Sequence, residues 1–194
     1  DFPSPGENTE ASTETITVAL SVDETRSLLQ KVPAAYNTQI NDVLLTALAQ
    51  AVAPWAGGRS LLVDLEGHGR EDLGDGLDLS RSVGWFTSVF PVRLELPTAG
   101  GVGDAVKSVK EQLRRIPQRG IGYGVLRYLA GDAVLQAQRQ PGIVFNYLGQ
   151  FDQVLAGSKL FSFAPEASGP WHSPRNARRH WLEINSLVIG EKLE

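Results

Sequence analysis

The chain of 194 residues contains no cysteine, no methionine and only three histidines. Without cysteine, the protein can form no disulfide bond, no thiolate nucleophile and no cysteine-ligated zinc site. The absence of cysteine fits a reducing compartment, and we expect a cytoplasmic location. Because the chain begins with aspartate and has no methionine anywhere, we also expect that it was processed or cut from a longer polypeptide.

Long apolar runs and an excess of positive charge are also missing. No segment approaches the roughly 20 apolar residues that a membrane-spanning helix needs, and no signal peptide is visible. The formal net charge is −4, so we expect neither a nucleic-acid partner nor an anionic membrane surface. Hydrophobic residues make up 42% of the chain, which is enough for the core of one domain or of one lobe of a larger domain.

Metal-dependent and serine-hydrolase chemistry receive no support from the motifs. The histidines His68, His172 and His180 have no metal-ligand spacing, and the chain has no Gly-x-Ser-x-Gly sequence. We therefore expect no metal site, and we interpret His68 as a structural or hydrogen-bonding residue.

Strand-like and helical patterns alternate after a polar, proline-containing segment, residues 1–14, that is predicted to be a linker. This alternation predicts an α/β layered fold with a mixed sheet packed with helices. Strands are expected over residues 15–22, 60–65, 87–96, 143–147, 159–163 and 181–189. Helices are expected from Asp23 to about Val32, where Pro33 ends the helix, and over residues 38–55, 103–115 and 125–138. Pro91 predicts an edge strand or a bulge.

The first candidate for chemistry is EGHGRE, residues 66–71, which follows the predicted strand 60–65. Loops at strand ends often carry functional residues, and the two glycines permit close approach of a substrate or another backbone segment. Desolvation of Glu66 beside apolar Leu65 would raise its pKa and allow proton exchange near neutral pH. The alternative is a solvated loop in which Glu66, Arg70 and Glu71 pair with one another or with water.

The second candidate is FNYLGQFD, residues 145–152, at the end of a predicted strand. Asn146 could bind a carbonyl or enolate oxygen, and Tyr147 could donate a hydrogen bond or a proton. The alternative is that Tyr147 packs in the core with its hydroxyl group satisfied.

Two further stretches have weaker signals. Residues 82–91 place Trp85 and two phenylalanines around a Gly-Trp turn, which fits a core wedge and a substrate-channel wall equally well. Residues 120–124, which contain Tyr123, lack dinucleotide spacing and a P-loop lysine, so we predict a flexible or tightly packed loop.

Five stretches, in this order, resemble the C-terminal half of the epimerization domains of nonribosomal peptide synthetases. They are NDVLLTAL (41–48), EGHGRE (66–71), SVGWFTSVFPV (82–92), IPQRGIGYG (116–124) and FNYLGQFD (145–152). The resemblance covers residues 15–193. The pair EGHGRE and FNYLGQFD favours the epimerization branch over ordinary condensation domains, which share the fold.

The resemblance implies a chloramphenicol-acetyltransferase-like fold of two lobes around a cleft, with no directly bound cofactor. The substrate would be an aminoacyl or peptidyl thioester on the 4′-phosphopantetheine arm of a carrier domain, and the reaction would remove the α-proton and return it on the opposite face. The resemblance also implies that Glu66 is an acid/base group and that Tyr147 lies at the active site, with Asn146 beside it. We assign four further residues to the substrate channel or to loop structuring: His68, Arg70, Trp85 and Tyr123.

One element of that family is missing, because its His-His-x-x-x-Asp-Gly motif in the N-terminal lobe has no match here. We therefore expect residues 15–194 to form a C-terminal lobe that is inactive alone. Its expected partners are the missing N-terminal lobe, a peptidyl carrier domain and neighbouring synthetase modules. Two alternatives are half of a condensation domain that forms peptide bonds, and a noncatalytic module that docks a carrier domain.

Overall fold

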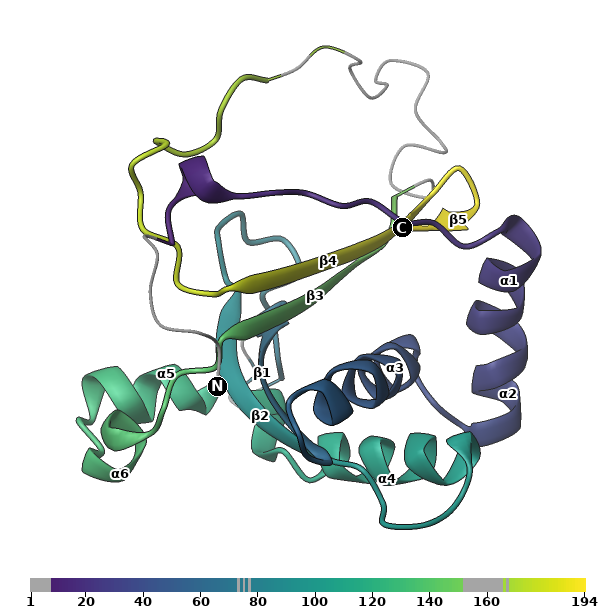
Figure 1. The fold of residues 1–194 in the computed structure, drawn as a ribbon. Helices are drawn as coiled ribbons and strands as arrows, with labels where there is room; N and C mark the ends of the chain where they lie inside the picture. The colour runs from purple at the N-terminus through teal and green to yellow at the C-terminus, as the bar shows by residue number, and fades with distance from the viewer. Residues whose placement is uncertain (1–7, 73, 75, 77, 152–165, 167) are drawn as a thin grey trace.

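A five-stranded mixed sheet forms the centre of the computed structural model, which describes residues 8–72, 74, 76, 78–151, 166 and 168–194 (Figure 1). The strands are β1 (Ser60–Gly67), β2 (Ser88–Glu95), β3 (Ile143–Gln150), β4 (Leu182–Ile189) and β5 (Lys192–Leu193), in the order β2-β1-β3-β4-β5. β1 pairs antiparallel with β2 and parallel with β3, β3 pairs parallel with β4, and β4 pairs antiparallel with β5. The predicted mixed sheet is confirmed.

Helices pack against this sheet and extend from its two sides (Figure 1). The N-terminal helical segments are η1 (Glu10–Ser12), α1 (Val22–Arg26), the π-helical turn η2 (Ser27–Lys31) and α2 (Val32–Tyr36). The long helices α3 (Ile40–Trp55) and α4 (Val102–Arg114) contact each other, and they contact β1 and β2 respectively. The remaining segments are η3 (Pro117–Gly120), α5 (Gly122–Gly124), η4 (Val125–Leu129) and α6 (Ala133–Ala137).

The two faces of β1 have different chemistry, and this difference positions the site. Leu61, Val63 and Leu65 belong to one buried apolar cluster, which is completed by residues of α3, α4, β2 and β3. Because successive side chains of a strand point to opposite faces, Asp64 and Glu66 lie on the other face of β1. The strand therefore has an apolar face toward the helices and an acidic face away from them.

The prediction of a strand over residues 15–22 is wrong. Ile16 is 86% exposed and Val18 is 76% exposed, and the backbone is held near its end by the Leu20 N–H, which donates to the Leu193 carbonyl at 2.8 Å. The alternating residues have high β propensity, but along most of the segment no neighbouring strand pairs with them. Since β propensity depends strongly on packing against neighbours, the pattern alone was insufficient.

The predicted N-cap and the predicted end of the following helix are also wrong. Ser21, rather than Asp23, caps the helix: its Oγ accepts from the Glu24 N–H, while the Glu24 carboxylate accepts from the Ser21 N–H at 2.9 Å. Pro33 does not stop the helix, because it lies in the first turn of α2, where a missing N–H is tolerated. The helix ends instead at Asn37, which adopts a left-handed φ of 50°.

Several predicted elements are confirmed with small shifts, and others are not. The predicted helices 38–55 and 103–115 correspond to α3 and α4, and Pro91 lies in β2, an edge strand. The predicted loop 120–124 is instead largely helical, and the predicted helix 125–138 is broken at Gly131, where φ is +70°. The predicted strand 159–163 lies outside the described residues. Of the predicted linker, Asn8, Glu10 and Ala11 hydrogen-bond to residues 174–180.

Truncation of Leu45 tests the core between α3 and β1. Leu45 is 1% exposed, so Leu45→Ala is expected to lower the free energy of unfolding by about 2–5 kcal/mol. The matched control is Leu129→Ala, at a residue that is 83% exposed, with an expected change within about 0.5 kcal/mol. Urea denaturation measures both, and equal losses for the two variants would contradict the assignment of the core.

Candidate active site

Glu66 and Asn146 lie side by side on the face of the sheet away from α3 and α4. The parallel register of Leu65 with Phe145 makes Glu66 of β1 the neighbour of Asn146 of β3. Asn146 Nδ2 donates a hydrogen bond to Glu66 Oε2 at 2.8 Å. Sheet pairing thus joins two of the sequence-predicted site residues that are 80 positions apart. Glu66 and Gly67 belong to β1 itself, which corrects the prediction that the strand ends at Leu65.

The surroundings of Glu66 favour proton transfer. Partial burial raises the pKa of its carboxyl group above the ordinary value of 4.5, His180 acts in the opposite direction, and Glu183 raises the pKa further. The residue as a whole remains accessible to solvent. A carboxyl group that is partly desolvated, yet open on one side, is suited to exchanging a proton with a bound molecule.

Tyr147 has a different position from its neighbour Asn146. Because side chains alternate along β3, Tyr147 faces the helices. Its side chain is partly buried and packs against the apolar cluster. Burial raises the pKa of its phenol above 10.0, so the group is a neutral hydrogen-bond donor at physiological pH. This packing agrees with the alternative weighed for Tyr147, while the residue also lines a cavity.

A cavity of about 350 Å³ lies between the end of the sheet, the start of α3 and the end of α4. All five of the motif stretches contribute to its wall. They do so through Asn41, Asp42, Leu45, Glu66, Gly67, Glu71, Phe90, Ile116, Arg119, Phe145 and Tyr147. Stretches that are far apart in the sequence therefore meet around one space next to Glu66.

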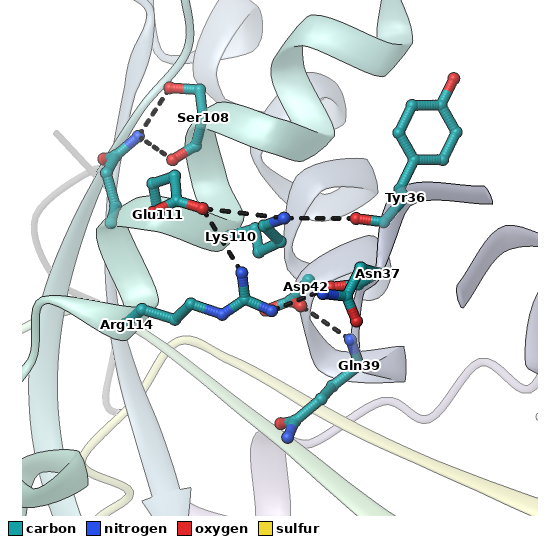
Figure 2. Close-up of polar contacts among 9 residues, drawn as sticks. Tyr36, Asn37, Gln39, Asp42, Ser108, Lys110, Glu111 and Arg114 are labelled. Carbon is teal, nitrogen blue, oxygen red and sulfur yellow. Dashed lines mark hydrogen bonds and ion pairs between the residues drawn. The ribbon is translucent and has the colours of Figure 1, made fainter. Parts of the chain in front are cut away.

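Polar contacts hold the start of α3 at this cavity (Figure 2). Lys110 Nζ of α4 donates to the Tyr36 carbonyl at 3.2 Å, and an Arg114 guanidinium nitrogen donates to the Asn37 carbonyl at 2.9 Å. The Asp42 carboxylate accepts from the Gln39 N–H at 2.8 Å. Because these α4 side chains bind main-chain carbonyls, hydrophobic spacing gave no signal for their role.

The EGHGRE loop is held by its own side chains. His68 Nδ1 accepts a hydrogen bond from the Arg70 N–H at 2.9 Å, and His68 Nε2 lies 3.2 Å from Glu71 Oε1. Glu71 Oε2 lies 3.6 Å from an Arg119 guanidinium nitrogen. Glu71 thus links this loop to the IPQRGIGYG stretch, and sequence reasoning missed the roles of both Glu71 and Arg119.

Arg70, Trp85 and Tyr123 lie outside the set of described residues that line this cavity. Arg70 donates to the Leu79 carbonyl at 2.7 Å and stacks over the Phe86 ring at 4.2 Å, a loop-structuring contact. Trp85 is 91% exposed. The Tyr123 hydroxyl accepts a hydrogen bond from Arg127 at 2.7 Å, and its ring packs against the core.

Neither a metal centre nor a membrane segment is found in the part of the chain that the structure describes. Within it, no three histidine, cysteine, aspartate or glutamate side chains gather in a way that could hold a metal ion. None of its helices combines the length and apolar character needed to cross a membrane.

The chain belongs to the condensation-domain family, whose model, described as "Condensation domain", matches residues 2–170. Among its relatives, a linear gramicidin synthase of Brevibacillus parabrevis is 50% identical over 196 residues, which cover 100% of this chain and 4% of that protein. Chondramide synthase of Chondromyces crocatus is 49% identical over 189 residues, covering 97% of this chain and 5% of that protein. The chain therefore spans only a small part of the curated relatives it matches.

Solved structures give the same family and a more specific likeness. The epimerization domain from the third module of tyrocidine synthetase B superposes with a TM-score of 0.85 at 40% identity, over 98% of this chain and 43% of that one. The first condensation domain of the CDA synthetase superposes with a TM-score of 0.51 at 19% identity, over 68% of this chain and 28% of that one. The second likeness shows a shared fold alone.

Substitution of Gly69 tests how closely the EGHGRE loop packs. Gly69 has φ +65°, and a Cβ atom there would lie 1.5 Å from the Phe86 carbonyl oxygen. The backbone would have to move, so Gly69→Ala is expected to lower the free energy of unfolding by clearly more than Gly57→Ala. Gly57 has φ +78° with open space around it, and its substitution should cost only the left-handed penalty of about 1–2 kcal/mol.

Urea denaturation of the two glycine variants makes the comparison. Equal losses of stability for Gly69→Ala and Gly57→Ala would contradict the close approach of the loop to Phe86.

Proposed function

We propose that this chain supplies the Glu66 carboxylate to the epimerization of an aminoacyl or peptidyl thioester carried on the 4′-phosphopantetheine arm of a carrier domain. The observation that carries the proposal is the hydrogen-bonded pair of Glu66 and Asn146, beside a cavity that all five motif stretches line. Carrier domains and neighbouring synthetase modules are its proposed partners, and the cytoplasm is its proposed location.

Glu66 and Asn146 together provide the base and the hydrogen-bond donor that α-proton exchange requires. The ionised Glu66 would take the proton from the α-carbon, and the C–H electron pair would move into the thioester carbonyl to give an enolate. Since one Asn146 amide hydrogen is directed to Glu66, the other is available to bind the enolate oxygen. Hydrogen bonding to a developing oxyanion is commonly the largest contribution to the rate of such a step.

The return of the proton on the opposite face requires a second donor. The enolate is planar, so a group on its far side must give a proton to the α-carbon to complete the inversion. We propose that this donor lies outside the chain, because the chain spans 43% of the similar epimerization domain.

Epimerization is preferred to peptide-bond formation because of the contrast between the two structural likenesses. Identity is 40% with an epimerization domain and 19% with a condensation domain. Analysis of the products separates the activities, since amide product without inversion would favour condensation. Exchange that is unaffected by loss of Glu66 would favour a noncatalytic docking role for this chain.

Replacement of the proposed base is the direct test. In the full-length protein, Glu66→Gln is expected to slow release of deuterium from a Cα-deuterated aminoacyl thioester on its carrier domain by about 10²–10⁴-fold. The matched control is Glu95→Gln, the same change at an exposed carboxylate that pairs with Arg93, and it should keep the wild-type rate. A wild-type rate in Glu66→Gln would refute the assignment.

A second test concerns the chain by itself. Residues 1–194 alone are expected to convert no L- to D-aminoacyl thioester above the uncatalysed rate, because the proposed second proton donor is absent. The full-length protein assayed at the same concentration is the control. Robust inversion by the chain alone would show that both proton transfers can be made by residues within it.

A further inference from the structure

An extended segment near the N-terminus, residues 13–20, lies between η1 and α1 and belongs to no strand of the sheet (Figure 1). Both of its ends are tied to the β4 region. Ahead of the segment, Asn8 Nδ2 donates to the His180 carbonyl at 3.0 Å, just before β4 begins. At its other end, the Leu20 N–H donates to the Leu193 carbonyl at 2.8 Å, in β5, which pairs with the end of β4. The segment therefore runs in the same direction as β4.

The edge of β4 on the side of this segment is open over most of its length. Of the described strands, β5 is the one that pairs with this edge, at Val188 and Ile189. Leu187 and Glu194 extend the pairing by one position, because they exchange main-chain hydrogen bonds of 3.0 and 2.9 Å. Within the described part of the chain, residues 182–186 therefore have no strand partner on this edge.

β5 has hydrogen bonds on both sides, as an inner strand of a sheet has. The main-chain groups of Glu194 face β4, whereas those of Leu193 face the other way. The Leu193 carbonyl accepts from the Leu20 N–H, and the Leu193 N–H donates to Thr25 Oγ1 at 3.0 Å. Since alternate residues of an antiparallel strand bond to opposite neighbours, a strand that continued β5 would bond in turn to β4 and to residues 13–20.

The register at Leu193 fixes where the residues of such a strand would lie. Leu193 is opposite Val188 of β4 and bonds to Leu20 on its other side. Antiparallel strands keep their register, so the second residue after Leu193 would lie between Ser186 and Val18. It would share the face of the sheet on which Leu193 and Val188 are buried.

The side chains along the two open edges suit an apolar partner. At the fourth residue after Leu193, the neighbours would be Ile184 of β4 and Ile16. Ile184 packs against the apolar cluster, whereas Ile16 and Val18 are exposed. A partner strand with apolar residues at these alternate positions would cover both exposed side chains and extend the apolar face. Open edges with exposed apolar side chains otherwise promote pairing with other chains.

We propose that the stretch of the full-length protein that continues β5 beyond Glu194 pairs with both open edges as an extended strand, with apolar residues at the second and fourth positions after Leu193. β5 already lies in line with both edges, so a strand from elsewhere or from a second copy would have to fit directly behind Glu194. In the linear gramicidin synthase relative, the matching region is 4% of the protein, so most of that protein lies outside it. The pairing would fasten the N-terminal segment to the sheet that carries Glu66, and it does not depend on the proposed reaction.

The test is hydrogen exchange in the full-length protein, read at single residues by mass spectrometry and corrected for intrinsic rates. The N–H groups of Val18 and Ile16 would face the added strand, because they lie two and four residues before Leu20. Those of Thr17 and Ala19 would face away. The first pair should exchange at least about tenfold more slowly than the second. Equal exchange at all four amides in the folded protein overturns the proposal.

Proline substitution in the full-length protein identifies the occupant. Proline at the second residue after Leu193 removes the N–H that would bond to the Val18 carbonyl, so the slow exchange at Val18 should be lost. The matched control, Thr17→Pro, removes an N–H that faces away and should leave exchange at Val18 within about threefold of wild type. Slow exchange at Val63, a buried residue of β1, reports that each variant is folded. Unchanged slow exchange at Val18 in the first variant would mean that another strand, such as one from a second copy, fills the edges, and it overturns the proposal.

Discussion

The parallel pairing of β1 with β3 is the contact on which the rest of the site depends. It sets Leu65 opposite Phe145, so the next residue of each strand, Glu66 and Asn146, must share the other face. A shift of one residue in either strand would turn one of the pair toward the helices. The apolar faces of both strands, buried against α3 and α4, oppose such a shift. Core packing therefore fixes the geometry of the polar pair.

The same arrangement separates two environments across one layer of backbone. Toward the helices lie the apolar cluster, the cavity and the Tyr147 ring. On the other face lie the Glu66 and Asn146 pair and Asp64. Glu66 nevertheless contributes to the wall of the cavity, because it lies at the end of β1 where the cavity opens. The end of β1, where Gly67 has no side chain, is where the two environments meet.

Much of the sheet could be predicted from the sequence, because apolar, β-branched runs such as residues 60–65 identify buried strands well. The alternating segment 15–22 failed because a pattern does not reveal whether a partner strand exists. The motif predicts acid/base chemistry at Glu66, whereas the contact of Glu66 with Asn146 depends on a strand register that no local pattern contains. The link between Glu71 and Arg119 was equally invisible, since it joins charges far apart in the sequence that were each compatible with a solvated surface.

The stability of the fold and the reactivity of the site make opposite demands on Glu66. Because burial raises the pKa of this carboxyl group in the folded state, the folded protein binds its proton more tightly than the unfolded chain does. Its contribution to stability is therefore present below the unfolded pKa and is lost as the pH rises through the higher folded value. Ionisation of Glu66 therefore has some cost to folding, and the ionised form is the one able to accept a proton.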